Sequence, residues 1–298
     1  MHRTLRYRKK LLSFRIRWFL FRLLAAILPD KYYIIWIYMK RLRKKPNLLN
    51  PQTFTEKMQW LKLNWRPNIL TQCADKYEVR KFVESRVGPA ILKELFGVYN
   101  RVEDINLDQL PNSFVLKVNH GCKQMVFCPN KADLNWTCST DLLTQYLKAN
   151  NYYRNREWAY KHIPPRIICE EHLTPKGETL LEYNFYCFNG IPHFVEITET
   201  KTNSKRVTFL DLAWNVVGRK YRAKALTDPL KPQELDQMVD YATRLSAGFP
   251  FVRVDLFYTN NRIYFGELTF YPLGGIFKFN PESIDLLLGS YLQIPSAI

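Results

Sequence analysis

Three charged residues stand inside a stretch that otherwise has the composition of a buried hairpin. The segment VRVDLFYTNNRIYFGELTF, residues 252–270, places Arg253, Asp255 and Glu267 among valine, leucine, isoleucine and aromatic residues. Charges within a buried hairpin are costly unless they are paired with opposite charges or bind a metal ion. The segment is therefore either a surface hairpin with solvated charges or part of a functional site.

Strand periodicity decides which of these side chains share a face. Arg253 and Asp255 point to one side, and the valines beside them point to the other. A three-residue turn at 260–262 would place Asp255 directly opposite Glu267, whereas a two-residue Asn260-Asn261 turn would shift the pairing by one. Cross-strand Cβ atoms lie about 4.5–5.5 Å apart, so two opposed carboxylates repel unless a cation separates them. We favour Mg²⁺, which prefers oxygen ligands, over a pair of solvated acids.

Mg²⁺ held by only two side chains usually shares its coordination sphere with phosphate oxygens, which need cations of their own. Lys117 lies inside the apolar stretch FVLKV, where an unpaired lysine would be costly. The loop that follows, Asn119-His120-Gly121, can offer backbone N–H groups to phosphate. Lys76, near the expected start of a helix, is a second candidate. Each signal is weak alone, because most lysines are simply solvated.

Capping residues and periodicity indicate the elements that position these groups. Residues 53–63 form a helix whose capping box joins a threonine to Glu56. A second helix starts at Asp75 and ends before Gly88, and the mixed acidic and basic segment 150–162 is expected to be an exposed loop. Together the pattern predicts an α+β protein with further helices over 132–150 and 231–249, strands over 113–121 and 166–173, and a hairpin over 180–198 that turns at Asn189-Gly190.

The composition is that of a folded protein with reduced thiols. Of the 298 residues, 47% are hydrophobic and 15% aromatic, which argues against a disordered chain. The cysteines show neither a C-x-x-C pair nor a zinc-ligand spacing with histidine, which favours a cytosolic setting and argues against a zinc site. They stand at positions 73, 122, 128, 138, 169 and 187.

The positive charge is concentrated at the N-terminus. Residues 1–45 contribute a net +13 of the chain's +17. Their most apolar stretch, 11–28, is interrupted by Arg15, Arg17 and Arg22, which are too many charges for a comfortable membrane-spanning helix. The stretch also lacks the small-residue cleavage site of a signal peptide.

Three uses of this arm remain open. Helical spacing gathers Leu11, Phe14, Trp18, Phe21 and Ile27 on roughly one side, which suits the headgroup region of an anionic membrane. The same pattern suits an amphipathic helix that packs on its own domain with solvated charges. A nucleic-acid arm needs far fewer apolar residues. We favour association with the membrane surface and expect no nucleic-acid partner.

The order of these features resembles the ATP-grasp superfamily: a helix-borne Asp-Lys, a strand lysine with a loop, then R-x-D, E-x-T and P-x-G. Local sequences resemble its TupA-like branch from about Pro51 to Leu292. They are FTEKMQWLKL, ADKYEVR, LPNSFVLKVNHG, REWAYKHIPPRIICEEHL, YNFYCFNGIPHF, FPFVRVDLF and IYFGELTFYPLGG.

The resemblance implies an α+β ATP-grasp fold, in which two lobes clamp ATP, preceded by a basic amphipathic helical arm. The expected division is an arm at 1–45, an N-terminal helical part at 46–105, a lid subdomain at 106–170 and a C-terminal subdomain with the metal site at 171–298.

The resemblance also implies roles for individual residues, with Arg253 and Lys117 as the catalytic pair. Where most ATP-grasp sites have asparagine as the last metal ligand, this chain has Thr269, so the number of Mg²⁺ ions, one or two, stays open. Carried over residue by residue, Lys76 and Lys117 hold ATP phosphates; Asn119, His120, Gly121 and Lys123 belong to a loop that covers the triphosphate; Glu170 and the backbone of Glu171 to Leu173 meet the adenine; Glu182 meets the ribose; Arg253 faces the γ-phosphate; Asp255 and Glu267 bind Mg²⁺.

The activity that the resemblance implies is ATP-dependent ligation of a carboxylate to an amine through an acyl phosphate. The expected substrates are an acidic sugar of a bacterial surface polysaccharide and an amino acid or amino sugar, joined at the inner face of the membrane. Lys205, Arg206 and Arg219 either receive an anionic acceptor or are solvated loop charges. The alternatives are a glycosyltransferase or kinase on the same fold, and a non-catalytic scaffold of a polysaccharide-assembly complex.

Overall fold

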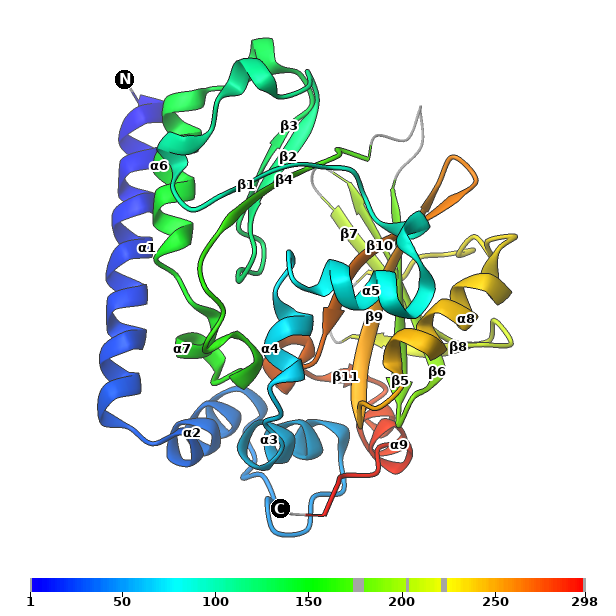
Figure 1. Cartoon of the computed structure of the whole chain (residues 1–298). Coiled ribbons are helices and arrows are strands. Elements are labelled where there is room, and N and C mark those ends of the chain that lie inside the picture. The colour runs from blue at the N-terminus through cyan, green and yellow to red at the C-terminus, as the bar shows by residue number, and fades with distance from the viewer. Residues whose placement is uncertain (1, 174–179, 202–203, 221–223, 297–298) are drawn as a thin grey trace.

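The computed structural model describes residues 2–173, 180–201, 204–220 and 224–296. Its strands form two antiparallel sheets that lie side by side, with helices around them (Figure 1). The α+β class expected from the sequence is confirmed. Within the described part of the chain, no helix is long and apolar enough to cross a membrane.

The smaller sheet has four strands and its own core. Helix α6 (Trp136–Leu147) packs against it, and Phe114, Leu116 and Leu143 are fully buried between them. The strand β1 (Leu95–Tyr99) lies in the range 46–105 that we expected to be helical. In spatial order the strands are β1 (Leu95–Tyr99), β4 (Ile167–Glu170), β2 (Phe114–Val118) and β3 (Met125–Cys128).

The larger sheet has seven strands among the residues that the structure describes. Helix α8 (Leu235–Ser246) covers the face formed by residues such as Phe185 and Cys187, whose Sγ contacts the Ala242 carbonyl. The opposite face carries Arg253, Asp255 and Glu267, the charged residues of the hairpin 252–270. In spatial order the strands are β10 (Arg262–Thr269), β9 (Phe251–Thr259), β5 (Leu181–Phe188), β6 (Ile191–Lys201), β7 (Ser204–Asp211), β8 (Val216–Lys220) and β11 (Phe279–Asn280).

Helix α3 (Phe54–Asn64) begins with the expected capping box and supports the turn that follows β10. The side-chain amide of Gln59 donates to the Gly275 carbonyl at 2.8 Å, and Lys62 Nζ donates to the Gly274 carbonyl at 2.5 Å. Lys62 is completely buried, and this burial lowers its pKa to about 8. Helix α3 thereby fixes the chain immediately after the charged end of β10.

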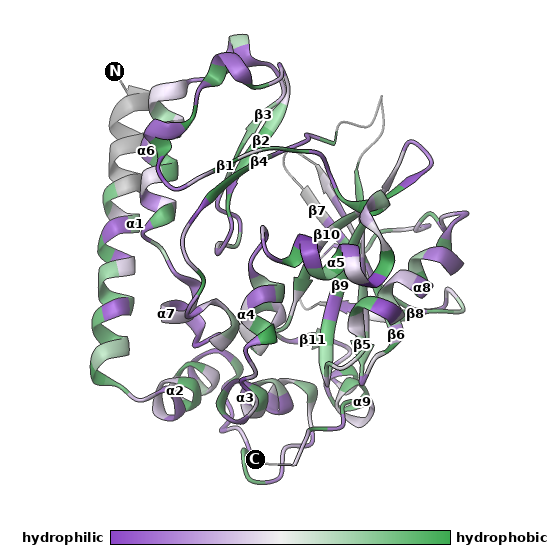
Figure 2. Cartoon of the chain, in the orientation of Figure 1, coloured by the Kyte–Doolittle hydropathy of each residue, from purple (hydrophilic) through white to green (hydrophobic). Residues whose placement is uncertain are grey.

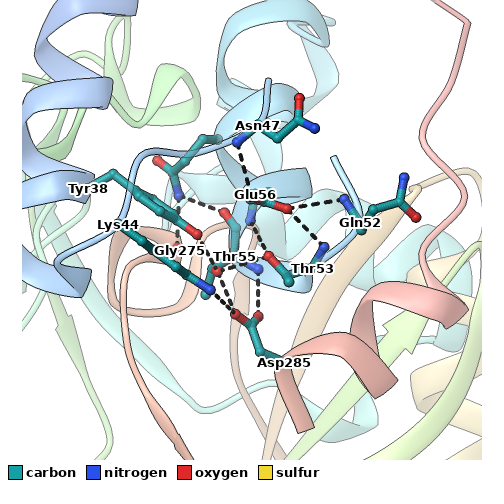
Figure 3. A network of polar contacts seen from close by, with 10 residues as sticks. Tyr38, Lys44, Asn47, Gln52, Thr53, Thr55, Glu56, Gly275 and Asp285 are labelled. Carbon is teal, nitrogen blue, oxygen red and sulfur yellow. Dashed lines mark hydrogen bonds and ion pairs between the residues drawn. The ribbon is translucent and has the colours of Figure 1, made fainter. Parts of the chain in front are cut away.

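A polar network around the start of α3 joins it to α2 (Asp30–Leu42) and to α9 (Ser283–Tyr291), as Figure 3 shows. Asp285 accepts hydrogen bonds from the Thr55 backbone N–H at 2.9 Å and from the Thr55 hydroxyl at 2.7 Å. The Tyr38 hydroxyl contacts the same Thr55 oxygen at 3.0 Å. Glu56 accepts from the backbone of Asn47, Gln52 and Thr53.

Two predictions of secondary structure are corrected. The predicted helix over 73–88 is two helices, α4 (Ile69–Ala74) and α5 (Val79–Val87). Asp75 lies between them because its Oδ1 accepts a hydrogen bond from the Tyr77 N–H at 2.8 Å. Such a local bond from an aspartate side chain competes with helix formation.

The segment 150–162 is not an exposed loop. It forms α7 (Asn151–Asn155) and a 3₁₀ turn (Trp158–Tyr160), and the Arg156 side chain is fully buried. Its guanidinium lies over the Tyr33 ring at 3.9 Å, and its Nε is 3.2 Å from Asp30 Oδ1. Helix α2 therefore supplies both partners that make the burial possible. The other expected elements form, with shorter helices than predicted.

The arm forms α1 (His2–Ile27) and α2, and α1 runs along one side of the molecule beside α6 and α7 (Figure 1). Trp18 is buried in this contact, and the Phe14 ring lies 5.7 Å from that of Tyr146. The expected grouping is wrong for Ile27, which is 72% exposed on the other side of the helix. The side chain of Leu11 lies outside the described part of the chain.

We predict that Asp285→Ala lowers the free energy of unfolding by roughly 2–4 kcal/mol, because it leaves two buried Thr55 donors without an acceptor. Asp285→Asn keeps one acceptor oxygen and should cost less. Asp240→Ala, at an aspartate whose side chain is 57% exposed, is the matched control and should have little effect. Urea denaturation measures all three, and an equal loss in Asp285→Asn and Asp285→Ala would contradict this account.

Candidate active site

A row of polar side chains crosses four neighbouring strands of the larger sheet. Glu267 on β10 is paired with Asp255 on β9, Asp255 with Asn184 on β5, and Asn184 with Glu196 on β6. Side chains in register on adjacent strands share a face. Asp255, Asn184 and Glu196 are all buried.

A bulge, rather than the turn, brings the two carboxylates opposite each other. The turn has the two residues Asn260 and Asn261, both at left-handed φ angles of 52° and 55°. A turn of this length would by itself offset the pairing. The register then shifts between Phe265 and Glu267, and the extra residue, Gly266, moves Glu267 onto Asp255. A Cβ atom on Gly266 would lie 2.8 Å from the Asp255 carbonyl oxygen, so only glycine permits this bulge without a shift.

Arg253 holds Asp255 in a two-point ion pair. Its Nε and terminal nitrogen lie 2.6 and 2.5 Å from the two carboxylate oxygens. Burial raises the pKa of Asp255 to about 7, although the guanidinium acts in the opposite direction. The Thr269 hydroxyl lies 3.3 Å from Asp255 Oδ2 and 3.1 Å from Glu267 Oε1, so it bridges the two carboxylates.

Lys76 joins the larger sheet to the loop of the smaller one. Its Nζ lies 2.9 Å from Glu267 Oε2 and donates to the Gly121 carbonyl at 3.0 Å. Burial opposes the ionisation of Glu267, but Lys76 outweighs it and holds the pKa of the carboxyl at about 2. The expected ATP-binding lysine therefore lies against an expected metal ligand.

Three cationic side chains lie close to the carboxylate of Glu170, at the end of β4. Lys117 Nζ lies 2.5 Å from it, and Arg80 and Lys93 each approach to 3.6 Å. Burial opposes ionisation, but these cations hold the pKa of Glu170 at about 2. Burial also lowers the pKa of Lys117, to about 8, despite the carboxylate beside it. Arg80 and Lys93 were missed by sequence reasoning, because neither interrupts an apolar strand as Lys117 does.

The loop between β2 and β3 has a buried base and an exposed tip. The Asn119 amide donates to Asp75 at 2.9 Å and its oxygen accepts from the Arg166 N–H at 2.8 Å, so its side chain anchors the loop. His120 is fully buried, and burial together with Lys76 lowers its pKa to about 4. Lys123 is exposed and at a left-handed φ of 58°.

The remaining expected residues are spread more widely. The Glu171 N–H donates to the Glu94 carbonyl at 3.0 Å, and Leu173 is half-buried after the end of β4. Glu182 shares the site face of β5, two residues before Asn184.

The three candidate acceptor-binding residues lie on strands further along the sheet from Asp255 and Glu267. Arg206 and Arg219 stand on β7 and β8, three and four strands from β9 in the sheet. Arg206 lies 3.8 Å from Glu199. The side chain of Lys205 is outside the described part of the chain.

The oxygen atoms around Asp255 suit a hard cation. Asp255 and Glu267 supply carboxylates and Thr269 a hydroxyl, which are ligand types that Mg²⁺ accepts together with phosphate oxygens. Asn184 Oδ1 is buried beside Asp255 without a hydrogen-bond partner among the described residues. Asn184 was missed, although its place two residues after Glu182 on one face of a strand could have indicated it. No group of three or more His, Cys, Asp or Glu residues in the described chain could hold a metal ion alone.

The sequence was compared with known protein families. The sequence matches the family described as TupA-like ATPgrasp over residues 56–293. The chain belongs to the TupA-like ATP-grasp family. The family and fold expected from the sequence motifs are thereby confirmed, and the carboxylate row and the lysines opposite it lie within the matched residues.

Solved structures with some likeness to the TupA-like chain include three ligases. D-alanine–D-alanine ligase from Bacillus anthracis complexed with ATP is 16% identical with a TM-score of 0.40, over 67% of this chain and 56% of that one. The Helicobacter pylori enzyme is 12% identical with a TM-score of 0.44, over 80% and 69%. ATP-grasp ligase PsnB complexed with a minimal precursor is 10% identical with a TM-score of 0.40, over 68% and 54%.

This chain spans little more than half the length of the first of these structures. No curated protein matches the sequence. The family assignment therefore rests on the sequence match alone.

We predict that Gly266→Ala destabilises the protein by about 1–3 kcal/mol, because the new Cβ meets backbone that cannot move aside. It should also weaken Mg²⁺-dependent nucleotide binding, since Glu267 no longer faces Asp255. Denaturant unfolding and calorimetric titration with Mg-ATP measure the two effects. Wild-type values for both would show that the bulge does not set the site.

We predict that nucleotide affinity falls as the pH rises through about 8, the pKa of Lys117. Below that pH the ammonium is already charged; above it, binding must take up a proton, and the affinity drops by up to about tenfold per pH unit. Lys117→Arg keeps its charge at every accessible pH and should flatten the profile. Calorimetric titration with Mg-ATP between about pH 7 and pH 9 tests this, and an equally steep profile in the arginine variant would refute it.

Proposed function

We propose that this TupA-like ATP-grasp chain is an ATP-dependent carboxylate-amine ligase. The observation that carries the proposal is the pair of opposed carboxylates, Asp255 and Glu267, with Arg253 on the same sheet face and Lys76, from the connection between α4 and α5, paired with Glu267. Buried charges of both signs at the junction of two sheets are costly to keep without a ligand of mixed charge. Mg-ATP is such a ligand.

Lys117, on β2 of the smaller sheet, and Lys76, in the connection between α4 and α5, would bind the phosphates. Lys76 and Lys117 now neutralise Glu267 and Glu170, and both ammonium groups are about nine-tenths buried. A triphosphate offers each of them a stronger anion at the same place. Lys123 at the exposed tip of the β2–β3 loop would add a third cation, and Glu170 would remain to orient Lys117 toward the nucleotide.

The carboxylate row would hold Mg²⁺. Asp255 and Glu267 are the ligands, with the Thr269 hydroxyl and Asn184 Oδ1 as further oxygen donors beside them. When bound, Mg²⁺ neutralises charge on the phosphate oxygens and orients them. Arg253 lies next to both acids, where its guanidinium can stabilise the charge that spreads over the transferred phosphoryl group.

The reaction has two displacements. A substrate carboxylate oxygen attacks the γ-phosphorus. The bond between the γ-phosphorus and the oxygen that bridges it to the β-phosphorus breaks, so that an acyl phosphate forms and ADP leaves. An amine then attacks the acyl carbon; inorganic phosphate leaves, and the nitrogen loses a proton as the amide forms. Arg253 and Lys117 stabilise charge in the first step, and no covalent nucleophile on the protein is needed.

The TupA-like resemblance supports an acidic sugar of a bacterial surface polysaccharide as the carboxylate and an amino acid or amino sugar as the amine. Arg206 and Arg219 are candidates for an extended anionic acceptor, because a polymer can reach strands well beyond the reacting group. A small acceptor at Asp255 would lie three strands from Arg206 and four from Arg219.

The decisive experiment traps the acyl phosphate. We predict that the protein with Mg-ATP, a uronic-acid glycan and hydroxylamine forms a hydroxamate and releases ADP and phosphate. Glu267→Gln and Arg253→Ala should each lower this rate by about 100-fold or more, because the first removes an anionic ligand of Mg²⁺ and the second removes a cation that faces the transferred phosphoryl group. Glu103→Gln, at an exposed glutamate, is the matched control.

Release of UDP from a sugar nucleotide, or ADP formation without hydroxamate, would contradict the ligase and indicate a transferase or kinase. In cells, mass spectrometry of the surface glycan with and without the protein should show the loss of an amide-linked group.

A further inference from the structure

Helix α1 has two apolar faces, and folding uses only one of them. The inner face packs against α6 and α7 through Phe14, Trp18 and Phe21. The outer face exposes a continuous stripe at helical spacing, which no described element covers (Figure 1). Its members and their exposures are Leu12 58%, Ile16 53%, Phe19 66%, Leu20 49%, Leu23 47% and Ile27 72%.

A stripe of this size is unusual on a soluble surface. Isolated exposed apolar residues need no explanation, but contiguous ones mark a place where something binds. The ribbon in Figure 2 shows green, hydrophobic segments along the described part of α1, interrupted by purple ones. In the sequence, Arg15, Arg17 and Arg22 interrupt this apolar part of the helix.

Basic residues border the stripe on both sides. On a helical wheel Arg15 and Arg22 fall on one flank and Arg17 on the other. Arg15 Nε is held by Gln145 at 2.8 Å, and the Arg22 guanidinium lies over the Tyr153 ring at 5.7 Å. These contacts fix two cations beside the apolar stripe, while Arg17 is exposed.

Helix α2 also exposes apolar and aromatic residues next to basic ones. It exposes Tyr32, Trp36 and Met39, and Lys40 Nζ lies 5.0 Å from the Trp36 ring centroid. Tryptophan and tyrosine beside lysine are typical of the boundary between lipid headgroups and acyl chains. The acid in this region, Asp30, is already neutralised by Arg66 and Arg156.

We propose that the outer face of α1 lies in the plane of an anionic lipid bilayer, with its apolar stripe below the headgroups and its arginines among the phosphates. An in-plane helix needs an apolar face, basic flanks and aromatic residues at the interface. The described part of the arm supplies all three, and residues 1–45 carry a net +13. The cytoplasmic leaflet of a bacterial membrane presents such a surface.

A second copy of this chain is a less suitable partner for the outer face of α1. Two α1 helices packed by their outer faces would bring the arginine flanks of both copies together, and like charges at a shared seam are destabilising. A nucleic acid would meet the arginines but not the apolar stripe. The bilayer is the occupant that satisfies both.

The test is co-sedimentation of the full-length protein with vesicles. We expect binding to phosphatidylcholine vesicles that contain phosphatidylglycerol, weaker binding to phosphatidylcholine alone, and release by salt. Ile16→Ser, Phe19→Ser and Leu23→Ser combined should reduce binding at least about tenfold, because three apolar side chains no longer enter the bilayer. Arg17→Glu should reduce binding to the anionic vesicles only.

The matched control replaces exposed leucines elsewhere. Leu286→Ser with Leu287→Ser on α9, which are 58% and 39% exposed, should leave vesicle binding unchanged. Thermal melting confirms that every variant folds. Binding that survives the α1 substitutions, or that the α9 substitutions reduce equally, overturns the proposal.

Light scattering in solution tests the alternative that two copies of the chain pack together by the outer face of α1. A dimer that dissociates in the Ile16, Phe19 and Leu23 variant would also overturn the proposal, in favour of a second copy. These readouts require no nucleotide and no substrate, so they stand or fall separately from the ligase activity.

Discussion

The side chain of Lys76 links Glu267 on the larger sheet to the Gly121 carbonyl in the β2–β3 loop of the smaller sheet, at the place where the chemistry would occur. A partly buried carboxylate beside the buried Asp255 is stabilised by a nearby cation, and the arginine on the neighbouring strand, Arg253, is engaged with Asp255. The cation therefore comes from the α4–α5 connection, whose Lys76 N–H is bonded to the Asn119 carbonyl beside β2.

Several local features follow from this requirement. Helix α4 has to stop before Lys76 so that the lysine can turn toward β10, and the Asp75 side chain stops it by bonding the Tyr77 N–H. The other oxygen of Asp75 accepts from Asn119, which anchors the base of the β2–β3 loop. One carboxylate therefore breaks a helix and positions a loop. On the other side, α3 holds the turn after β10 through Gln59 and Lys62.

The sequence was informative where a charge interrupts an apolar strand. Lys117, Asp255 and Glu267 were all identified in this way, and each is paired in the structure with an opposite charge. The facing of Asp255 and Glu267 was foreseen for the wrong reason. The turn is one residue shorter than that pairing needs, and the Gly266 bulge restores it. Periodicity shows neither, because a bulge is a local departure from it.

The partners of these charges were harder to predict. Arg80 and Lys93 reach Glu170 from a helix and from a segment without regular structure, where a cation is the ordinary expectation. Arg156 was predicted to be exposed because its neighbours are a mixture of acids and bases. It is buried because Asp30 and Tyr33 arrive from α2, more than a hundred residues earlier in the chain. Such burial depends on tertiary contacts that no local pattern encodes.

The N-terminal helix has apolar residues on two faces, and its packing within the described chain accounts for only one of them. Apolar residues on opposite faces of a helix cancel in any measure of amphipathicity, so α1 gives a weak periodic signal although both faces are strongly apolar. Packing against α6 and α7 accounts for Phe14, Trp18 and Phe21, and it leaves Phe19 and Ile27 more than three-fifths exposed. Since folding is complete without the outer face, its composition has to be explained by something outside the described chain. The proposed contact with a bilayer would account for it, because arginines on its borders favour an anionic surface.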